Sequence, residues 1–390
     1  VGIGINKSAD YNNQIYYKGV NKKSSYSEKY LEELVNDGAT DPNAALQNYP
    51  YGSSLALGTW LISPTYNSDS SEVIGYRSQA DPAFGLLQEN SIVTTGGITD
   101  VAIGTGINLK DKWYFGGTLT FPFLRYKRDG YYKESDESKD PNNDFSFFEA
   151  TESLETKGIG VNGKIGVIFK PVDYVRIGLA FHSPTFFQLT DKYVAKVATN
   201  LEGYGGAGVK QLSSTDVTGG GPLESSYNLI TPWRVMLSGS YVFREVENVE
   251  NQRAFITADV EYVNYKASSF RAVDNNTDTK NYYKSLNGTV DKLYKNAINV
   301  RLGGEIKFNT VMFRLGGAYY GNPYVNESSN LMKLSGGLGY RNKGIFIDLT
   351  YVHSLNKDIH YPYSLTDKPN TPAMLKNNAG GIVATIGFKI

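Results

Sequence analysis

The 390-residue sequence has no cysteine, which excludes thiolate metal sites, a cysteine nucleophile and disulfide cross-links. It also lacks any stretch that approaches the roughly 18 consecutive apolar residues of a membrane-spanning helix. Lys plus Arg equals Asp plus Glu at 39 each, so its charge indicates no nucleic-acid partner. What the sequence does have is 30 Tyr, 18 Phe and 41 Gly, a bias toward aromatic and small residues that suits β-strands.

Few residues could support catalysis or bind a metal. The 3 histidines are His182, His353 and His360, and none lies in a recognisable nucleophile motif. Segments 140–144 and 274–278 carry acidic and amide side chains, but neither fits the spaced calcium loop with its Gly and terminal Glu. We therefore expect no enzyme activity, no metal and no cofactor.

Alternation with a period of two residues is the dominant pattern. In 159–169, Ile159, Val161 and Ile165 share one face of a strand, whereas Asn162 and Lys164 share the other. A short turn follows at 170–173, and the chain returns through 174–182 with the same alternation. The pattern predicts a hairpin with a tight turn at one end.

The same alternation recurs along the whole chain. Clear strands are expected at 113–124, 233–244, 298–308, 313–319, 331–341, 344–353 and 378–390, and weaker ones near 1–6, 14–20, 54–63, 91–109, 145–158 and 251–266. The total is about a dozen to sixteen, with fourteen as the central expectation.

Short and long connections interleave along the sequence. Tight turns are expected at 110–112, 170–173 and 309–310, and long polar insertions at about 20–52, 64–90, 133–146, 195–225, 268–295 and 355–376. Segment 27–37 has apolar residues at helical spacing and predicts a short helix. We expect an all-β, transmembrane, antiparallel up-and-down β-barrel, with short periplasmic turns and long extracellular loops, in the outer membrane of a Gram-negative cell.

A large soluble β-sandwich remains an alternative, because its strands alternate in the same way. Aromatic placement favours the barrel, since Trp113, Tyr114, Trp233 and Tyr241 lie near strand ends, where an interfacial girdle belongs.

Two motifs carry a family resemblance. Arg176-Ile-Gly-Leu-Ala-Phe-His-Ser-Pro-Thr185 and Tyr227-Asn-Leu-Ile-Thr-Pro-Trp-Arg234 resemble the FadL/TodX family of outer-membrane transporters for long-chain fatty acids and aromatic hydrocarbons, its Bacteroidetes-type branch above all. The resemblance implies a fourteen-stranded barrel that contains an N-terminal hatch and passes hydrophobic substrates sideways through a kinked strand. The hatch motif Asn-Pro-Ala-Gly is missing, so we expect a single barrel domain over 1–390 whose hatch is either trimmed or absent.

If the apolar parity faces lipid, the lumen receives a set of charged residues. They are Lys164, Arg176, His182, Arg234, Asp259, Glu261, Arg301, Glu305, Lys307, Arg314 and Asp348. One interpretation is a hydrated, salt-bridged network that fills the barrel. The other is substrate binding, in which Arg176, Arg234, Arg301 or Arg314 meets a carboxylate head group.

Two further features have both a functional and a structural interpretation. Gly96 and Gly97 interrupt a long strand, and the family resemblance implies a lateral gate there, although an ordinary bulge gives the same pattern. Phe147, Phe148, Phe186 and Phe187 could capture hydrophobic substrate from the outside, or they could belong to the girdle or pack one loop on another.

Two functions are therefore expected as alternatives. The first is transport of a hydrophobic small molecule, with lateral release into membrane lipid. The second is a FadL-like barrel that serves as a structural or accessory subunit of a larger outer-membrane secretion or assembly complex, with other outer-membrane proteins as partners.

Overall fold

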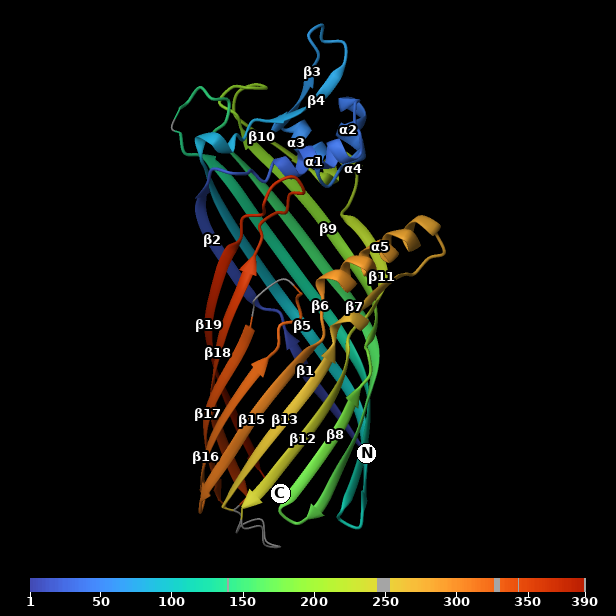
Figure 1. Ribbon diagram of the computed structural model, residues 1–390, viewed down its shortest axis with the longest axis vertical. Helices are drawn as coiled ribbons and strands as arrows, with labels where there is room; N and C mark the ends of the chain where they lie inside the picture. The colour runs from blue at the N-terminus through green and yellow to red at the C-terminus, as the bar shows by residue number, and fades with distance from the viewer. Residues whose placement is uncertain (139, 244–252, 326–329, 343, 389–390) are drawn as a thin grey trace.

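The computed structural model describes residues 1–138, 140–243, 253–325, 330–342 and 344–388, and most of them form one large antiparallel sheet curled into a tall cylinder (Figure 1). The ends of the expected strands at 244, 251–252 and 389–390 lie outside this set. The confirmed fold class is all-β, and the part of the chain that is described contains a 17-stranded sheet and a separate two-stranded hairpin.

The elements have the following bounds. The large sheet consists of β1 (Gly2–Asp10), β2 (Asn13–Asn21), β5 (Leu86–Leu109), β6 (Trp113–Asp136), β7 (Phe147–Val172), β8 (Val175–His182), β9 (Phe186–Asn200), β10 (Val209–Ser213), β11 (Leu223–Ile230), β12 (Trp233–Phe243), β13 (Ala254–Asn264), β14 (Ser269–Ala272), β15 (Ala297–Phe308), β16 (Val311–Tyr320), β17 (Asn330–Asn342), β18 (Ile345–His360) and β19 (Ala373–Phe388). The hairpin is β3 (Ile62–Tyr66) with β4 (Val73–Ser78), and the helices are α1 (Glu28–Asn36), α2 (Pro42–Asn48), α3 (Ser53–Gly58), α4 (Ser214–Thr218) and α5 (Thr277–Leu293), with short 3-10 turns at Pro82–Phe84 and Tyr265–Ala267.

Several of these strands are collinear pieces of one longer strand. β1 and β2 both pair with β5, β8 and β9 both pair with β7, and β10 and β11 both pair with β9. Joining these pieces, and likewise β11 with β12 and β13 with β14, leaves twelve wall strands among the described residues, at the lower end of the expected range. Each wall strand is antiparallel to the next one in sequence, which is the up-and-down topology.

The ladders run without a break from β1 and β2 at one edge of the sheet to β19 at the other. Near the top the first edge lies close to the end of the strand before the last, where the Tyr17 hydroxyl on β2 lies 2.8 Å from Nδ1 of His360 on β18. Just above, Asn21 donates to the hydroxyl of Tyr363 over 3.2 Å. Lower down, β1 and much of β19 are exposed on both faces.

The connections confirm the expected asymmetry between the two ends. At the lower end β5 and β6 are joined through Lys110–Lys112, where Lys110 and Asp111 adopt positive φ angles of 54°, and β15 and β16 through Asn309 and Thr310. At the upper end lie the long insertions, which include α5 and the segment between β2 and β5. The expected helix at 27–37 is present as α1, whereas the strand expected at 54–63 is wrong, because that stretch forms α3 and the start of β3.

An apolar belt surrounds the lower part of the sheet. On β6 the outward residues from Trp113 to Phe123 are aromatic, aliphatic or glycine, and the four large ones after Trp113 remain 39–49% exposed. The next two outward residues are Arg125 and Lys127. The belt is therefore about as long as a strand that crosses a bilayer, roughly 9–11 residues. Large apolar side chains exposed on this scale identify the face as the one that contacts lipid.

Aromatic side chains mark the edges of this belt. Trp113 stacks on Phe169 with ring centroids 4.3 Å apart at the lower edge, and Trp233 lies 5.7 Å from Tyr262 at the upper edge. Tyr114 departs from the expected girdle, because its position in the ladder turns it inward. In the described part of the chain no helix is both long and apolar enough to cross a bilayer.

A compact cap lies at the upper end of the cylinder (Figure 1). β5, β6 and β7 are 24, 24 and 26 residues long, more than a bilayer requires, so they rise above the belt and carry the cap. Leu34, Leu55 and Leu61 from the insertion between β2 and β5 pack in one buried cluster with Phe148 and Val197 of the wall. This cluster is the main apolar core of the molecule, and it lies outside the membrane.

Candidate functional site in the barrel lumen

The inner face of β5–β8 is hollow because its side chains are small. Gly106, Gly116, Gly166 and Ala180 lie in one row across these four strands, on the parity that points into the barrel. A cavity of about 750 Å³ lies along this face. Its volume falls within the range of about 300–1,000 Å³ that is usual for small-molecule pockets.

Polar residues line one end of this cavity. Lys164 and His182 are direct neighbours across β7 and β8, and Arg234 of β12 follows His182 in the same row. Nζ of Lys164 lies 3.9 Å from the Asp100 carboxylate. Nδ1 of His182 is buried and has no hydrogen-bond partner among the described residues. The end with Lys164 and His182 can therefore bind a polar group, whereas the row of Gly106, Gly116, Gly166 and Ala180 offers no polar side chain.

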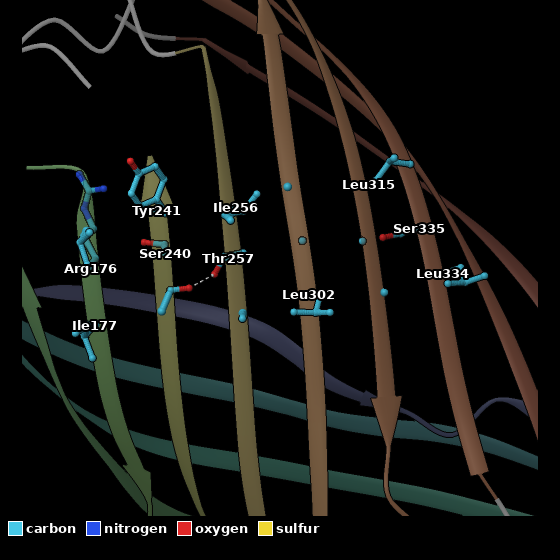
Figure 2. Close-up of a pocket in the computed structure, with 17 residues that line it drawn as sticks. Arg176, Ile177, Ser240, Tyr241, Ile256, Thr257, Leu302, Leu315, Leu334 and Ser335 are labelled. Carbon is cyan, nitrogen blue, oxygen red and sulfur yellow. Dashed lines mark hydrogen bonds between the residues drawn. The ribbon is translucent and has the colours of Figure 1, made fainter. Parts of the chain in front are cut away.

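A second cavity, of about 1080 Å³, extends over β8, β12, β13, β15, β16 and β17 (Figure 2). Gly303 and Gly316 lie opposite each other in its middle, and the Thr257 hydroxyl donates to the carbonyl of Gly239 over 3.2 Å. Its lining includes outward Leu302 and Leu315 as well as inward Ser240. Residues of both faces contribute because the wall here is a single sheet that is rich in glycine.

The upper charged residues of the lumen form one network around a buried carboxylate. The side chain of Glu261 is 1% exposed, and its Oε2 lies 2.5 Å from Nη2 of Arg301 and accepts from Asn299 over 3.0 Å. Its Oε1 lies 3.4 Å from Nη1 of Arg234. Asp259 lies directly across from Arg301 in the ladder.

The lower charged residues form a second network around Arg314. This guanidinium donates from Nε to Glu305 and from Nη1 to Asp348, each over 2.6 Å. Between the two networks the inward positions are small, as at Gly303 between Arg301 and Glu305. Arg234, Arg301 and Arg314 are thus all paired with carboxylates, as the network interpretation requires. Arg176 also has an interaction partner, and it lines the larger cavity.

The two motifs of the sequence form one kink in the wall. Ser183–Thr185 separates β8 from β9, and Thr231 with Pro232 separates β11 from β12 beside it. Side chains complete the interrupted ladder, because the Ser183 hydroxyl accepts from the amide of Gly163 over 2.9 Å and the Thr231 hydroxyl accepts from the amide of Thr185 over 2.8 Å. The sequence signals the kink through its prolines but not these hydroxyl partners.

Gly96 and Gly97 lie at a second irregularity. Gly96 has a φ of +113°, and a Cβ there would come within 2.1 Å of the Arg125 carbonyl oxygen. The ladder to β6 passes through both glycines, but on the other side β1 ends and β2 begins. Here Asn12 replaces a backbone partner by accepting from the amide of Gly96 over 3.2 Å.

The four phenylalanines expected in loops lie instead in strands, because β7 and β9 extend above the belt. Phe148 is fully buried under the cap, and Phe147 lies on the opposite face beneath Lys133, whose Nζ is 4.4 Å from its ring centroid. Phe186 is 53% exposed on the outer wall, whereas Phe187 is buried on the inner face. They do not form one capture surface.

The cap is held to the wall by a buried carboxyl group that the sequence did not single out. Glu134 accepts from the Tyr26 amide, the Tyr132 hydroxyl and the Gln88 amide, each over 2.8 Å, and from the Ser25 hydroxyl over 2.5 Å. Burial raises the pKa of Glu134 to about 7, although these donors favour the carboxylate. Glu134 lies far above Arg125, outside the membrane belt, so its proton exchanges with an aqueous phase.

An up-and-down antiparallel sheet with an apolar outer belt, a charged interior, short turns at one end and long insertions at the other has the architecture of bacterial outer-membrane β-barrels. The chain is a membrane protein of that class.

Comparisons with known proteins give similarities in structure alone. No family model matches the sequence, and no curated protein matches it. The chain is similar to the toluene transporter TodX of P. putida, with a TM-score of 0.46 and 11% identity over 97% of this chain and 89% of that one. It is also similar to the toluene transporter TbuX of Ralstonia pickettii (TM-score 0.43, 13% identity, 78% of each chain) and to a FadL homologue of Pseudomonas aeruginosa (TM-score 0.44, 13% identity, 77% of this chain and 73% of that one).

Proposed function

We propose that this barrel transports a hydrophobic small molecule across the outer membrane, by way of the cavity along β5–β8. The row of Gly106, Gly116, Gly166 and Ala180 supports this proposal most directly, because it leaves room for an apolar molecule against the wall. Lys164 and His182 at one end, with Arg234 next to His182 in the same ladder row, suit a substrate with a polar head group, such as a fatty acid.

Filling the cavity tests this proposal. Ala180→Trp places a large side chain in the hollow, and we expect it to reduce uptake of a labelled fatty acid by at least tenfold. Ser226→Trp, on the exposed outer face of β11, is the matched control and should leave uptake unchanged. Normal uptake by a folded Ala180→Trp barrel would refute the path along β5–β8.

The arginines can be tested by comparing two substrates. Replacing Arg176 and Arg234 with Ala should reduce uptake of a fatty acid and leave uptake of toluene unchanged, because only the fatty acid has a carboxylate to bind. If the double variant took up both the fatty acid and toluene at the parental rates, a head-group role for these arginines would be excluded.

Lateral release is the second part of the proposal, and we assign it to the break between β1 and β2 beside Gly96 and Gly97. Here the wall is held by the side chain of Asn12 and by the Tyr11 amide, which donates to the Gly96 carbonyl over 3.1 Å, and the Tyr11 and Tyr126 rings, 5.5 Å apart, lie next to these bonds. A molecule could leave at the upper edge of the belt if these contacts separate.

A disulfide staple tests this exit. Because the sequence has no cysteine, only the two introduced cysteines can pair within the chain. Asn13→Cys with Thr94→Cys links cross-strand partners of β2 and β5 beside the break. Oxidation should slow release into the membrane, and reduction should restore it. The control staple Gly4→Cys with Ala102→Cys lies in the ladder between β1 and β5, away from the break, and should have no effect. Release at the parental rate from the oxidised Asn13–Thr94 staple would exclude this exit.

A further inference from the structure

The outer face of the wall has its own groove, of about 440 Å³, where β7, β9, β11 and β14 lie side by side. One ladder row crosses it, from Ile159 through Gln188 and Asn228 to Arg271. The row below contributes Phe186 and Ile230, which pair with each other. The groove therefore has an apolar side and a polar rim.

This groove faces the surroundings of the barrel and not its lumen. Ile159 is 58% exposed on the same outward parity as Phe123 of β6, and the ladder carries this parity across to Arg271. Phe187 and Leu229, which have the opposite parity, point inward behind the groove. A ligand here would lie outside the transport path.

The groove lies at the upper boundary of the membrane belt. The outward row above Ile159 contains Lys157 and Arg125, and the aromatic pair of Trp233 and Tyr262 lies below it. Aromatic belts of this kind lie at the level of lipid head groups. Phe186 and Ile230 thus continue the apolar surface upward to that level, and Arg271 lies at its end.

Arg271 differs from the other outward cations near this boundary in its partners. Lys157 is 2.5 Å from the Glu155 carboxylate, and Lys192 is 2.5 Å from that of Glu224. Arg271 is exposed and lies directly across from the neutral Asn228, and in the described part of the chain no carboxylate lies within ion-pair distance of it. Its charge is therefore available to an external anion.

We propose that this groove binds a lipid of the outer leaflet that has a phosphate-bearing, net anionic head group. Acyl chains pack against Phe186 and Ile230, the phosphate accepts hydrogen bonds from the guanidinium of Arg271, and the Asn228 amide adds a donor beside it.

Native mass spectrometry of the purified full-length barrel tests this site. The protein is exchanged into phosphatidylglycerol or into phosphatidylcholine of the same chain length, and retained lipids are counted. We expect the parent to retain phosphatidylglycerol preferentially, and Arg271→Gln to reduce that preference about fivefold, the effect of one cation near an anionic surface. Asn228→Glu places a carboxylate directly across from Arg271. It should reduce the preference for phosphatidylglycerol by a similar factor, although the cation is still present.

Lys157→Gln is the matched control, because it removes an outward cation of the same boundary that already has a carboxylate partner, and it should change the preference less than twofold. Equal retention of both lipids by the parent, or an unchanged preference in Arg271→Gln, would overturn the proposal. If the parent formed a dimer and Arg271→Gln abolished it, the proposal would also be overturned, because the groove would then bind a second copy of the chain. The readout is independent of transport, so it can succeed or fail separately from the proposed function.

Discussion

At the scale of single residues, the structure places its most unusual carboxyl groups where neighbouring side chains compensate for burial. Glu134 has four donors and no cation, and Glu261 has two arginines and an amide. Buried charge without such partners is costly, so each group ties together segments that are far apart in sequence.

Glu134 makes docking of the cap dependent on pH. Its pKa is about 7 in the folded protein, above the ordinary 4.5, so the folded protein binds the proton more tightly than the undocked segment does. The resulting stabilisation is fully present below about pH 4.5, decreases as the pH rises, and is lost once the pH passes about 7. We expect amide protection in α1, corrected for intrinsic exchange, to fall about tenfold between pH 6 and pH 8.

Glu134→Gln is the control for this effect. Its amide oxygen can still accept hydrogen bonds and it does not titrate, so protection in α1 should become independent of pH. A parent protein whose α1 exchanges equally at both pH values would show that Glu134 does not control docking.

Removal of the Glu261 carboxylate should destabilise the barrel. Glu261→Ala leaves Arg301 and Arg234 without their shared partner inside the lumen, and we expect a loss of about 2–4 kcal/mol in the free energy of unfolding. This loss is measured by urea unfolding in detergent, with the folded fraction read from the heat-modifiable mobility of the barrel on a gel. Glu224→Ala, which breaks an exposed pair with Lys192, should change stability by less than about 1 kcal/mol. Equal effects of the two variants would contradict a structural role for the network.

At the scale of elements, the kink shows how a strand can break within a wall and keep its hydrogen bonds. Pro184 and Pro232 cannot donate, and the side chains of Ser183 and Thr231 accept the amides of Gly163 and Thr185. An amide without a partner near lipid costs several kcal/mol, so these hydroxyls stabilise the kink.

Thr231→Val removes one of them with little change in shape. The amide of Thr185 would lose its partner, and we expect a destabilisation of about 1–3 kcal/mol in the same unfolding assay. Thr190→Val, which breaks only the exposed contact between Thr190 and Ser226, should change stability by less than about 0.5 kcal/mol. If Thr231→Val were as stable as the parent, the Thr185 amide would have found another partner, either water or a shifted strand.

At the scale of the whole molecule, apolar side chains face out and charged side chains face in. Leu315 is 77% exposed, which is unremarkable for one residue but part of a continuous belt here. A soluble sandwich, the alternative left open by the sequence, would bury this parity instead.

A single charge on the belt distinguishes the two arrangements. Leu315→Arg should destabilise the barrel in lipid bilayers by about 2–4 kcal/mol, the effect of an arginine near the bilayer midplane. Val35→Arg on α1 replaces a residue that is 66% exposed on the cap, and it should be neutral within about 0.5 kcal/mol. If both substitutions were neutral in bilayers, the belt would not contact lipid.

Sequence reasoning identified the fold class because its signals are local. The alternation in 159–169 and 174–182 is a property of neighbouring residues, and the structure has β7 and β8 there, with the turn at Asp173 and Tyr174 instead of 170–173 because β7 continues to Val172. The stretch 54–63, expected as a strand, has no such local signal and forms α3 and the start of β3. Its apolar residues give no clear period, and their burial in the cap was decided by Leu34 and Phe148, which lie distant in sequence.

By itself the sequence determined which side chains face lipid and which face the lumen, because a period of two residues fixes the face once a strand forms. The choice of partner for each charge, such as Glu305 and Asp348 for Arg314, and the place where the inner wall is bare enough to leave a cavity are visible in the folded sheet alone. These contacts depend on the register between strands, and register is set by the packing of the whole sheet rather than by any one segment.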